Sequence, residues 1–155
     1  MDSTTPEGRL AAMGITLPAA PRPVAAYVPY VRTGNLVFVS GQVPFKDGSL
    51  LAVGRVPDQV DVETAIACAR QCALNGLAIA RDAAGSLDNV RRVVRLGVFV
   101  AAQAGFHEEP KIGNGASQLM LDVFGDAGRH ARAAVGVSDL PLGAPVEVDF
   151  VFEVA

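Results

Sequence analysis

Residues 61 to 84 repeat apolar and polar side chains with a period of about 3.6 residues, the period of an α-helix. Small and aliphatic side chains, such as Ile66 and Leu77, fall along one side of this helix. The polar side chains fall within one arc opposite them, namely Glu63, Arg70, Gln71, Asn75, Arg81 and Asp82. We therefore predict a long helix that ends at Gly85 and lies on a sheet.

Strands are predicted where β-branched residues are dense or where apolar and polar residues alternate. Four segments meet this description: 35–43, 89–102, 131–137 and 145–154. A turn is expected at Lys46-Asp47-Gly48, after the first of them. In the last segment Val148 and Phe150 alternate with Glu147 and Asp149, so one face of this strand is buried and the other is polar.

The remaining segments are predicted to form two helices and two connecting stretches. A short N-terminal helix is capped by Ser3, Thr4 or Thr5 and ends at Gly14. Residues 18–23 form an extended connector because their prolines cannot continue a helix, and residues 105–113 form a polar loop. A further helix covers about residues 114–124, where apolar residues form a stripe.

These elements predict one domain, residues 1–155, of the α+β class. A chain of 155 residues, 50% of them apolar, can build one core but not two. With 6% aromatic residues and no Trp, the interior consists mainly of Ala, Val and Leu, so the layers should approach closely. Both long helices can cover one face of a mixed sheet. The other face then needs cover, which oligomerisation would provide.

Charge and motifs exclude several classes of protein. The net charge is −3, and Arg91, Arg92 and Arg95 form the one cluster of basic residues, which argues against a nucleic-acid partner. The most apolar window, 93–102, contains Arg95 and is about half the ~20 residues of a membrane span. The N-terminus lacks the pattern of a signal peptide, so we expect a cytoplasmic protein without a membrane partner.

The sequence offers little for metal or nucleophile chemistry. It contains no P-loop, no Gly-x-Gly-x-x-Gly and no Gly-x-Ser-x-Gly. Cys68 and Cys72 lie four residues apart in the predicted long helix, and we expect buried thiols. The two histidines are His107, in a polar loop, and His130, which is a candidate for lining whatever site Arg132 serves.

Arg132 is the most informative charged residue because it stands at the start of an apolar strand. A planar guanidinium suits a carboxylate ligand. Alternatively, Arg132 is a charge on an edge strand or the ion-pair partner of Glu147 on a facing strand. Glu147 also has two interpretations. It is an ordinary surface residue, or it stands opposite the arginine and holds a water for proton transfer.

Two motifs then point to a family. The first is Gly34-Asn35-Leu36-Val37-Phe38-Val39-Ser40-Gly41-Gln42-Val43-Pro44, and the second is Ala131-Arg132-Ala133-Ala134-Val135 followed by Leu140-Pro141 and Val146-Glu147-Val148. Together they resemble the Rid family, the YjgF-like reactive intermediate deaminases, over residues 24–154; residues 1–23 form an added helix and connector. The resemblance implies a chorismate-mutase-like fold, a closing hairpin, a homotrimer with its helices outside, and ligand clefts between neighbouring subunits.

The resemblance also implies an activity and its residues. In catalytically competent members an arginine clamps the carboxylate of a 2-imino or 2-enamino acid, and a glutamate positions the water that hydrolyses it to a 2-keto acid and ammonia. These roles fall to Arg132 and Glu147. The implied substrate-binding positions are Tyr27, with Tyr30 as a competitor, Ser40, Asn114, with Gln118 as the alternative, and the backbone N–H near Ala134.

The implied reaction needs no cofactor, because imine hydrolysis requires a bound carboxylate, a placed water and proton transfer. The sequence departs from the family at Ala25-Ala26, where Gly-Pro is common, at Ala133-Ala134, where Ser-Cys is frequent, and in a longer loop at 103–113. Two other classes of function remain: a non-catalytic small-carboxylate-binding or regulatory trimer, and an endoribonuclease, which the acidic charge balance disfavours.

Overall fold

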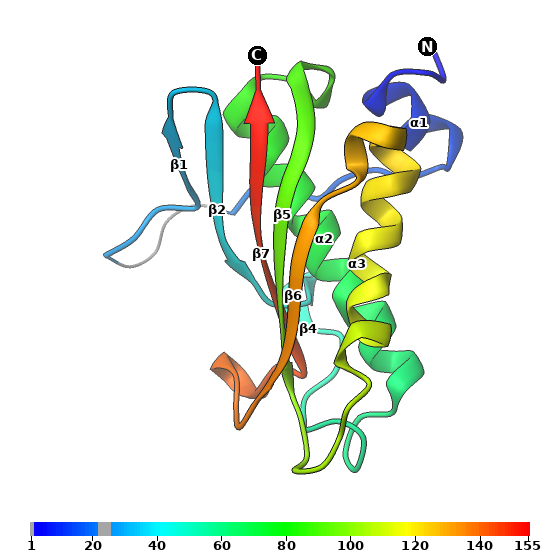
Figure 1. Ribbon diagram of the computed structural model, residues 1–155, viewed down its shortest axis with the longest axis vertical. Helices are drawn as coiled ribbons and strands as arrows, with labels where there is room; N and C mark the ends of the chain where they lie inside the picture. Colours follow the sequence, from blue (N-terminus) through cyan, green and yellow to red (C-terminus); the bar gives the residue numbers. More distant parts are fainter. Residues whose placement is uncertain (1, 22–25) are drawn as a thin grey trace.

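The computed structural model describes residues 2–21 and 26–155 and consists of a layer of strands and a layer of helices (Figure 1). The strands are β1 (Tyr30–Thr33), β2 (Leu36–Gln42), β3 (Phe45–Lys46), β4 (Ser49–Leu50), β5 (Val90–Ala101), β6 (Ala131–Val137) and β7 (Val146–Val154). The helices are α1 (Pro6–Ala12), α2 (Val62–Ala84) and α3 (Glu109–Phe124), with short 3₁₀ turns at Leu87–Asn89, Gly125–Gly128 and Pro141–Gly143.

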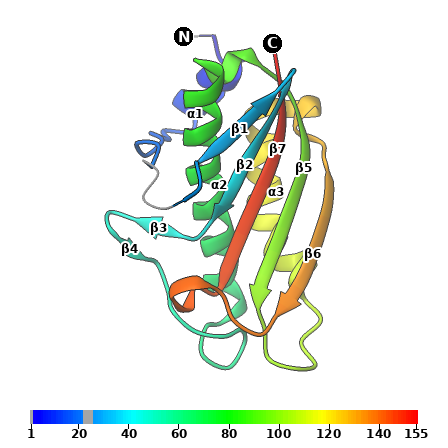
Figure 2. The same cartoon turned by 90° about the vertical axis from the view of Figure 1, so that its left-hand side faces the viewer.

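The main sheet has five strands in the order β1-β2-β7-β5-β6, and β3 pairs with β4 in a separate hairpin. Strands β5 and β6 run parallel, whereas the other neighbours in the main sheet are antiparallel. Helices α2 and α3 cover one face of this mixed sheet, as Figures 1 and 2 both show. The predicted α+β class with two long helices on one face is confirmed.

The predicted closing hairpin is wrong, because β5 lies between β6 and β7. Arg132 on β6 is opposite Leu96, and Glu147 on β7 is opposite Phe99. A parallel pair needs a crossover connection, which α3 provides between β5 and β6. Strand β7 therefore returns along the other edge of β5, and Glu147 does not face Arg132 across a strand pair.

Most predicted boundaries agree with the structure within one or two residues, but three regions differ. Helix α3 begins at Glu109, with Pro110 in its first turn, so the predicted loop at 105–113 is shorter. Strand β1 and the β3–β4 hairpin were not expected as strands. The hairpin turns at Asp47 and Gly48, whose φ values of 53° and 88° are the left-handed values that a tight hairpin requires. Residues 22–25, which include the end of the predicted connector and Ala25, lie outside the described residues.

Helix α2 buries more of its surface than its pattern indicated. Gln71 and Asn75 were predicted on the polar outer arc, but each is only 7% exposed. Both lie where the segment after β2 covers the helix, and Asn75 donates to backbone carbonyl groups of that segment. Cys68 and Cys72 are buried free thiols, as expected, and burial raises the pKa of Cys68 to about 11.

The described residues contain neither a membrane-spanning helix nor a cluster of metal ligands. No helix has both the length and the apolar character to cross a bilayer. Nowhere in residues 2–21 and 26–155 do three His, Cys, Asp or Glu side chains converge as a metal ion would require.

Glycines allow the helices and the sheet to approach closely, as the composition indicated. A methyl group added to Gly76 on α2 would fall on the ring of Phe150, which belongs to β7. A methyl group on Gly115 of α3 would fall on the backbone oxygen of Ile66 on α2. The α2–α3 contact is therefore a backbone contact that a larger residue cannot enter without moving a helix.

We predict that Gly115→Ala destabilises the protein. Alanine favours a helix over glycine by about 1 kcal/mol, but overpacking costs about 1–3 kcal/mol, and here the obstacle is backbone. The free energy of unfolding, measured with urea, should fall, whereas Lys111→Ala at an exposed position of the same helix should change it by less than about 0.5 kcal/mol. A stabilised Gly115→Ala variant would contradict the close α2–α3 contact.

Candidate functional site

Arg132 reaches from the edge strand β6 toward α3 and is fixed there by three acceptors. Its Nη1 donates to Asn114 Oδ1 at 2.9 Å and to Ser117 Oγ at 3.1 Å. Its Nη2 donates to the carbonyl oxygen of Pro110 at 3.2 Å. Asn114 therefore lies beside Arg132, whereas Gln118 donates to Asp122 at 2.9 Å instead. The guanidinium is held in one orientation by the first three turns of α3.

A Ser–His pair lies behind this arginine. His130 Nδ1 is 2.6 Å from the carbonyl oxygen of Gly128, which can only accept, so Nδ1 carries the proton. The Nε2 atom then accepts from Ser117 Oγ at 2.8 Å. Burial, with a smaller contribution from the charge of Arg132, lowers the pKa of His130 and favours this neutral form. The hydroxyl of Ser117 thus accepts from Arg132 and donates to His130.

Ser117 was missed by the sequence analysis, and His130 was only a weak candidate. The spacing offered one signal for Ser117. Residues three apart on a helix share a face, so a serine three residues after Asn114 points to the same neighbours as the asparagine. Ala134, two residues after Arg132, projects to the same side of β6 and is half-buried.

Glu147 lies on the opposite face of the sheet. Its neighbours Val146 and Val148 are buried beneath the helices, so the alternation of β7 directs Glu147 to the other side. The glutamate is half-buried, and burial, followed by the charge of Asp149, raises the pKa of its carboxyl group. The carboxylate lies against Gly41 on β2, where an added Cβ would be 2.6 Å from Glu147 Oε2. Gly41 is therefore the residue that makes room for this carboxylate.

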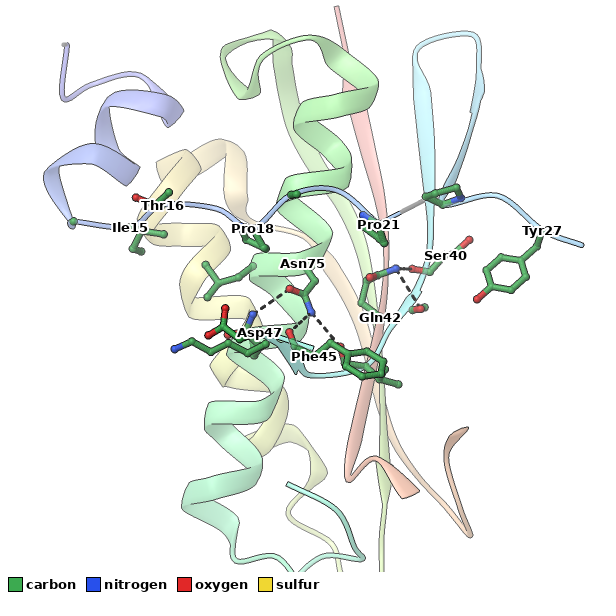
Figure 3. A pocket seen from close by; sticks show the side chains of 18 residues that line it. Ile15, Thr16, Pro18, Pro21, Tyr27, Ser40, Gln42, Phe45, Asp47 and Asn75 are labelled. Atoms are coloured by element: carbon green, nitrogen blue, oxygen red, sulfur yellow. Dashed lines mark hydrogen bonds between the residues drawn. The ribbon is translucent and has the colours of Figure 1, made fainter. Parts of the chain in front are cut away.

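Tyr27 and Ser40 line a cavity of about 660 Å³ next to Gly41 (Figure 3). Ser40 Oγ donates to the carbonyl oxygen of Val28 at 2.6 Å, which ties the segment of Tyr27 to β2. The tyrosine ring is 62% exposed. Tyr30, the competing tyrosine, is in β1 and does not line the cavity.

Two buried amides from α2 form another wall of this cavity. Asn75 Nδ2 donates to the carbonyl oxygens of Val43 at 3.1 Å and Phe45 at 3.0 Å. Asn75 Oδ1 accepts from Gln71 Nε2 at 3.1 Å. Figure 3 shows Asn75 pointing toward the strand that carries Phe45, with the segment from Ile15 to Pro21 on the far side. Sequence reasoning missed both amides because it placed them in solvent.

The structure thus separates the predicted residues into two groups. Arg132, Asn114 and Ala134 lie between β6 and α3, on the helix side of the sheet. Tyr27, Ser40 and Glu147 gather around the end of β2.

The fold is that of a small α+β domain with one mixed sheet, and comparison with known proteins gives its family. A family model described as "YjgF/chorismate_mutase-like, putative endoribonuclease" matches residues 7–154. The chain belongs to this family, the YjgF-like or Rid family of the sequence analysis.

Three similar proteins illustrate the range of this family. Protein TCP17 of Trypanosoma cruzi is 46% identical over 156 residues, covering 97% of this chain and 98% of TCP17. The 2-iminobutanoate/2-iminopropanoate deaminase of Dermatophagoides farinae is 26% identical, covering 87% of this chain and 91% of that protein. The crystal structure of Atu1372 from Agrobacterium tumefaciens, a protein with unknown function, matches with a TM-score of 0.90 and 46% identity, covering 97% and 92% of the two chains.

The neutral state of His130 predicts how stability depends on pH. The unfolded chain binds a proton at His130 near its ordinary pKa of 6.5, whereas the folded chain binds it only at lower pH. Within that window the unfolded state holds more protons, so the free energy of unfolding falls as the pH falls. Urea unfolding between about pH 7.5 and 5 should show this decline in the wild type and a smaller one in His130→Gln. Parallel pH profiles for the two proteins would rule out a neutral buried His130.

Proposed function

We propose that the protein hydrolyses 2-imino and 2-enamino acids to 2-keto acids and ammonia. The observation that carries this proposal is that the chain holds both a guanidinium fixed by three acceptors and a half-buried carboxylate of raised pKa. The deaminase of Dermatophagoides farinae supports it as a relative whose name states this reaction.

Arg132 would bind the carboxylate of the substrate. A guanidinium has five N–H donors, and three are used by Asn114, Ser117 and Pro110. The Nε–H and the second Nη2–H have no acceptor among the described residues. A carboxylate can accept two parallel hydrogen bonds from a guanidinium, and the backbone N–H near Ala134 would add another donor. The substrate is thereby oriented by groups that do not react.

Glu147 would activate the water. Burial and the charge of Asp149 make its carboxylate a stronger base, which improves proton transfer near neutral pH. The water oxygen bonds to the C=N carbon while Glu147 takes the water proton, and the hydroxyl of Tyr27 can supply a proton to the nitrogen. Glu147 then gives its proton to the nitrogen while the carbinolamine hydroxyl passes its proton to the Tyr27 oxygen, so the C–N bond breaks, ammonia leaves and the 2-keto acid remains. Ser40 would fix the segment that carries Tyr27.

One chain cannot bring Arg132 and Glu147 together, because they lie on opposite faces of the sheet. We propose that the site forms between subunits of a homotrimer, where the β6–α3 side of one chain meets the β2–β7 side of the next. A cyclic ring uses such head-to-tail contacts. The open face of the sheet also exposes Phe38 and Val31, which are paired across β1 and β2 and need cover.

A second class of function is a carboxylate-binding or regulatory trimer without catalysis. The Arg132–Asn114–Ser117 cluster favours it, because this cluster is complete within one chain and needs no contribution from Glu147. Endoribonuclease activity is less consistent with the protein, since the final strand is acidic and the net charge is −3.

Kinetics of two single variants separate these functions. Wild-type protein should accelerate hydrolysis of 2-iminopropanoate, generated by an amino-acid oxidase and trapped competitively by semicarbazide. Arg132→Ala should lose binding and activity together. Glu147→Gln should still bind a 2-keto acid but lose about 10²–10⁴-fold in turnover, because the base is gone. Binding without any wild-type acceleration would favour the non-catalytic trimer.

Mixing the two inactive variants tests whether the site is shared. If each site takes Arg132 from one chain and Glu147 from its neighbour, random assembly of Arg132→Ala with Glu147→Gln chains restores about one quarter of the sites. We expect activity to return when the two variants are refolded together. Each variant refolded alone is the control. If mass spectrometry demonstrates mixed oligomers and activity does not return, the result would contradict a site that takes Arg132 and Glu147 from neighbouring chains.

A further inference from the structure

The cavity beside Tyr27 and Ser40 is larger than a small imino acid needs. Its volume of about 660 Å³ lies within the range of pockets that hold drug-sized ligands. A three- or four-carbon acid would occupy only the end near Tyr27 and Ser40. We propose that the cavity receives the side chain of the substrate, so that the preferred substrates are 2-imino acids with branched or aromatic apolar side chains. This inference rests on the deaminase function proposed above.

The cavity lies next to the proposed reaction centre. Gly41 lines the cavity and also contacts the carboxylate of Glu147. Gly41 is therefore one residue that the cavity and the surroundings of that carboxylate share. A substrate whose C=N group lies near Glu147 and Tyr27 therefore has its side chain directed past Gly41 into this space.

The walls suit an apolar group. The segment after α1 contributes Ile15, Pro18 and Pro21, α2 contributes Leu74 and β3 contributes Phe45. The charged residues Lys46 and Asp47 also line the cavity. The amide of Asn75 is already engaged by two carbonyl groups and by Gln71, so it does not require a polar ligand. An apolar side chain entering the cavity would bury hydrocarbon surface without leaving this amide unpaired.

The wall formed by the N-terminal segment is anchored to the core rather than loosely placed. Leu17 is only 7% exposed, and the backbone N–H of Ile15 donates to the carbonyl oxygen of Leu10 at 3.0 Å. Helix α1, which precedes it, is tied to the domain by Glu7, which accepts from the backbone N–H of Leu87 at 3.0 Å and pairs with Arg81 at 3.3 Å. The N-terminal segment therefore defines a fixed boundary for the side chain.

The test compares substrates of different size in the wild type and in variants whose cavity is filled by a larger side chain. Wild-type kcat/KM is measured for 2-iminopropanoate and for the imino acids formed from leucine and phenylalanine by an amino-acid oxidase. The larger substrates should be preferred. Leu74→Trp, and Ile15→Trp on the opposite wall, should lower kcat/KM for the larger substrates by about tenfold or more while leaving 2-iminopropanoate nearly unchanged. Leu121→Trp on α3, a half-buried leucine away from the cavity, is the matched control.

Two results overturn the proposal, and they differ from failure of the deaminase function. Rapid turnover of 2-iminopropanoate with poor turnover of the larger substrates would refute the cavity assignment and leave the deaminase function intact. If no imino acid is turned over, calorimetric binding of phenylpyruvate and pyruvate decides. Tighter binding of phenylpyruvate that Leu74→Trp abolishes would support the side-chain site without catalysis, whereas equal affinities would refute it.

Discussion

The crossover through α3 determines where the arginine lies, and most features of the candidate site depend on it. Because β5 and β6 are parallel, the chain must return to the start of β5 before β6 can form, and α3 makes that return on the helix side of the sheet. Arg132 then emerges at the edge of the sheet against the first three turns of the same helix. Its acceptors from Pro110 to Ser117 are thus supplied by the connection that positions its strand.

The group formed by Tyr27, Ser40 and Glu147 depends on a different constraint, the close contact between β2 and the Glu147 side chain of β7. Glu147 is accommodated because Gly41 has no side chain, and α2 lies near the sheet because Gly76 makes room for Phe150. The half-burial that follows raises the pKa of Glu147. Small residues therefore set both the distance between the layers and the basicity of the carboxylate.

The sequence was sufficient for the parts of the structure that depend on local periodicity. The long helix, the strand that contains Ser40 and the alternating final strand all follow from patterns within one segment. Pairing between strands depends on distant segments, so no local pattern showed that β5 separates Arg132 from Glu147. Asn75 illustrates the same limit, since a polar residue on an outer arc is buried when another segment supplies carbonyl groups to its amide, and Gln71 is buried with it because it donates to Asn75. Family motifs identified Arg132 and Glu147, but not the Ser117–His130 pair, which lies outside those motifs.

In the proposed function, the separation of the two groups would link catalysis to assembly. A guanidinium and a carboxylate placed side by side in one chain would form an ion pair. The guanidinium would then be occupied, and its charge would lower the pKa of the carboxyl group. On opposite faces of one sheet, Arg132 keeps two N–H donors for a ligand and Glu147 keeps a raised pKa. A site completed by a neighbouring chain would hold one substrate between Arg132 of one chain and Glu147 of the other. The shared site that we propose would therefore use both faces of the sheet, one from each of two neighbouring chains.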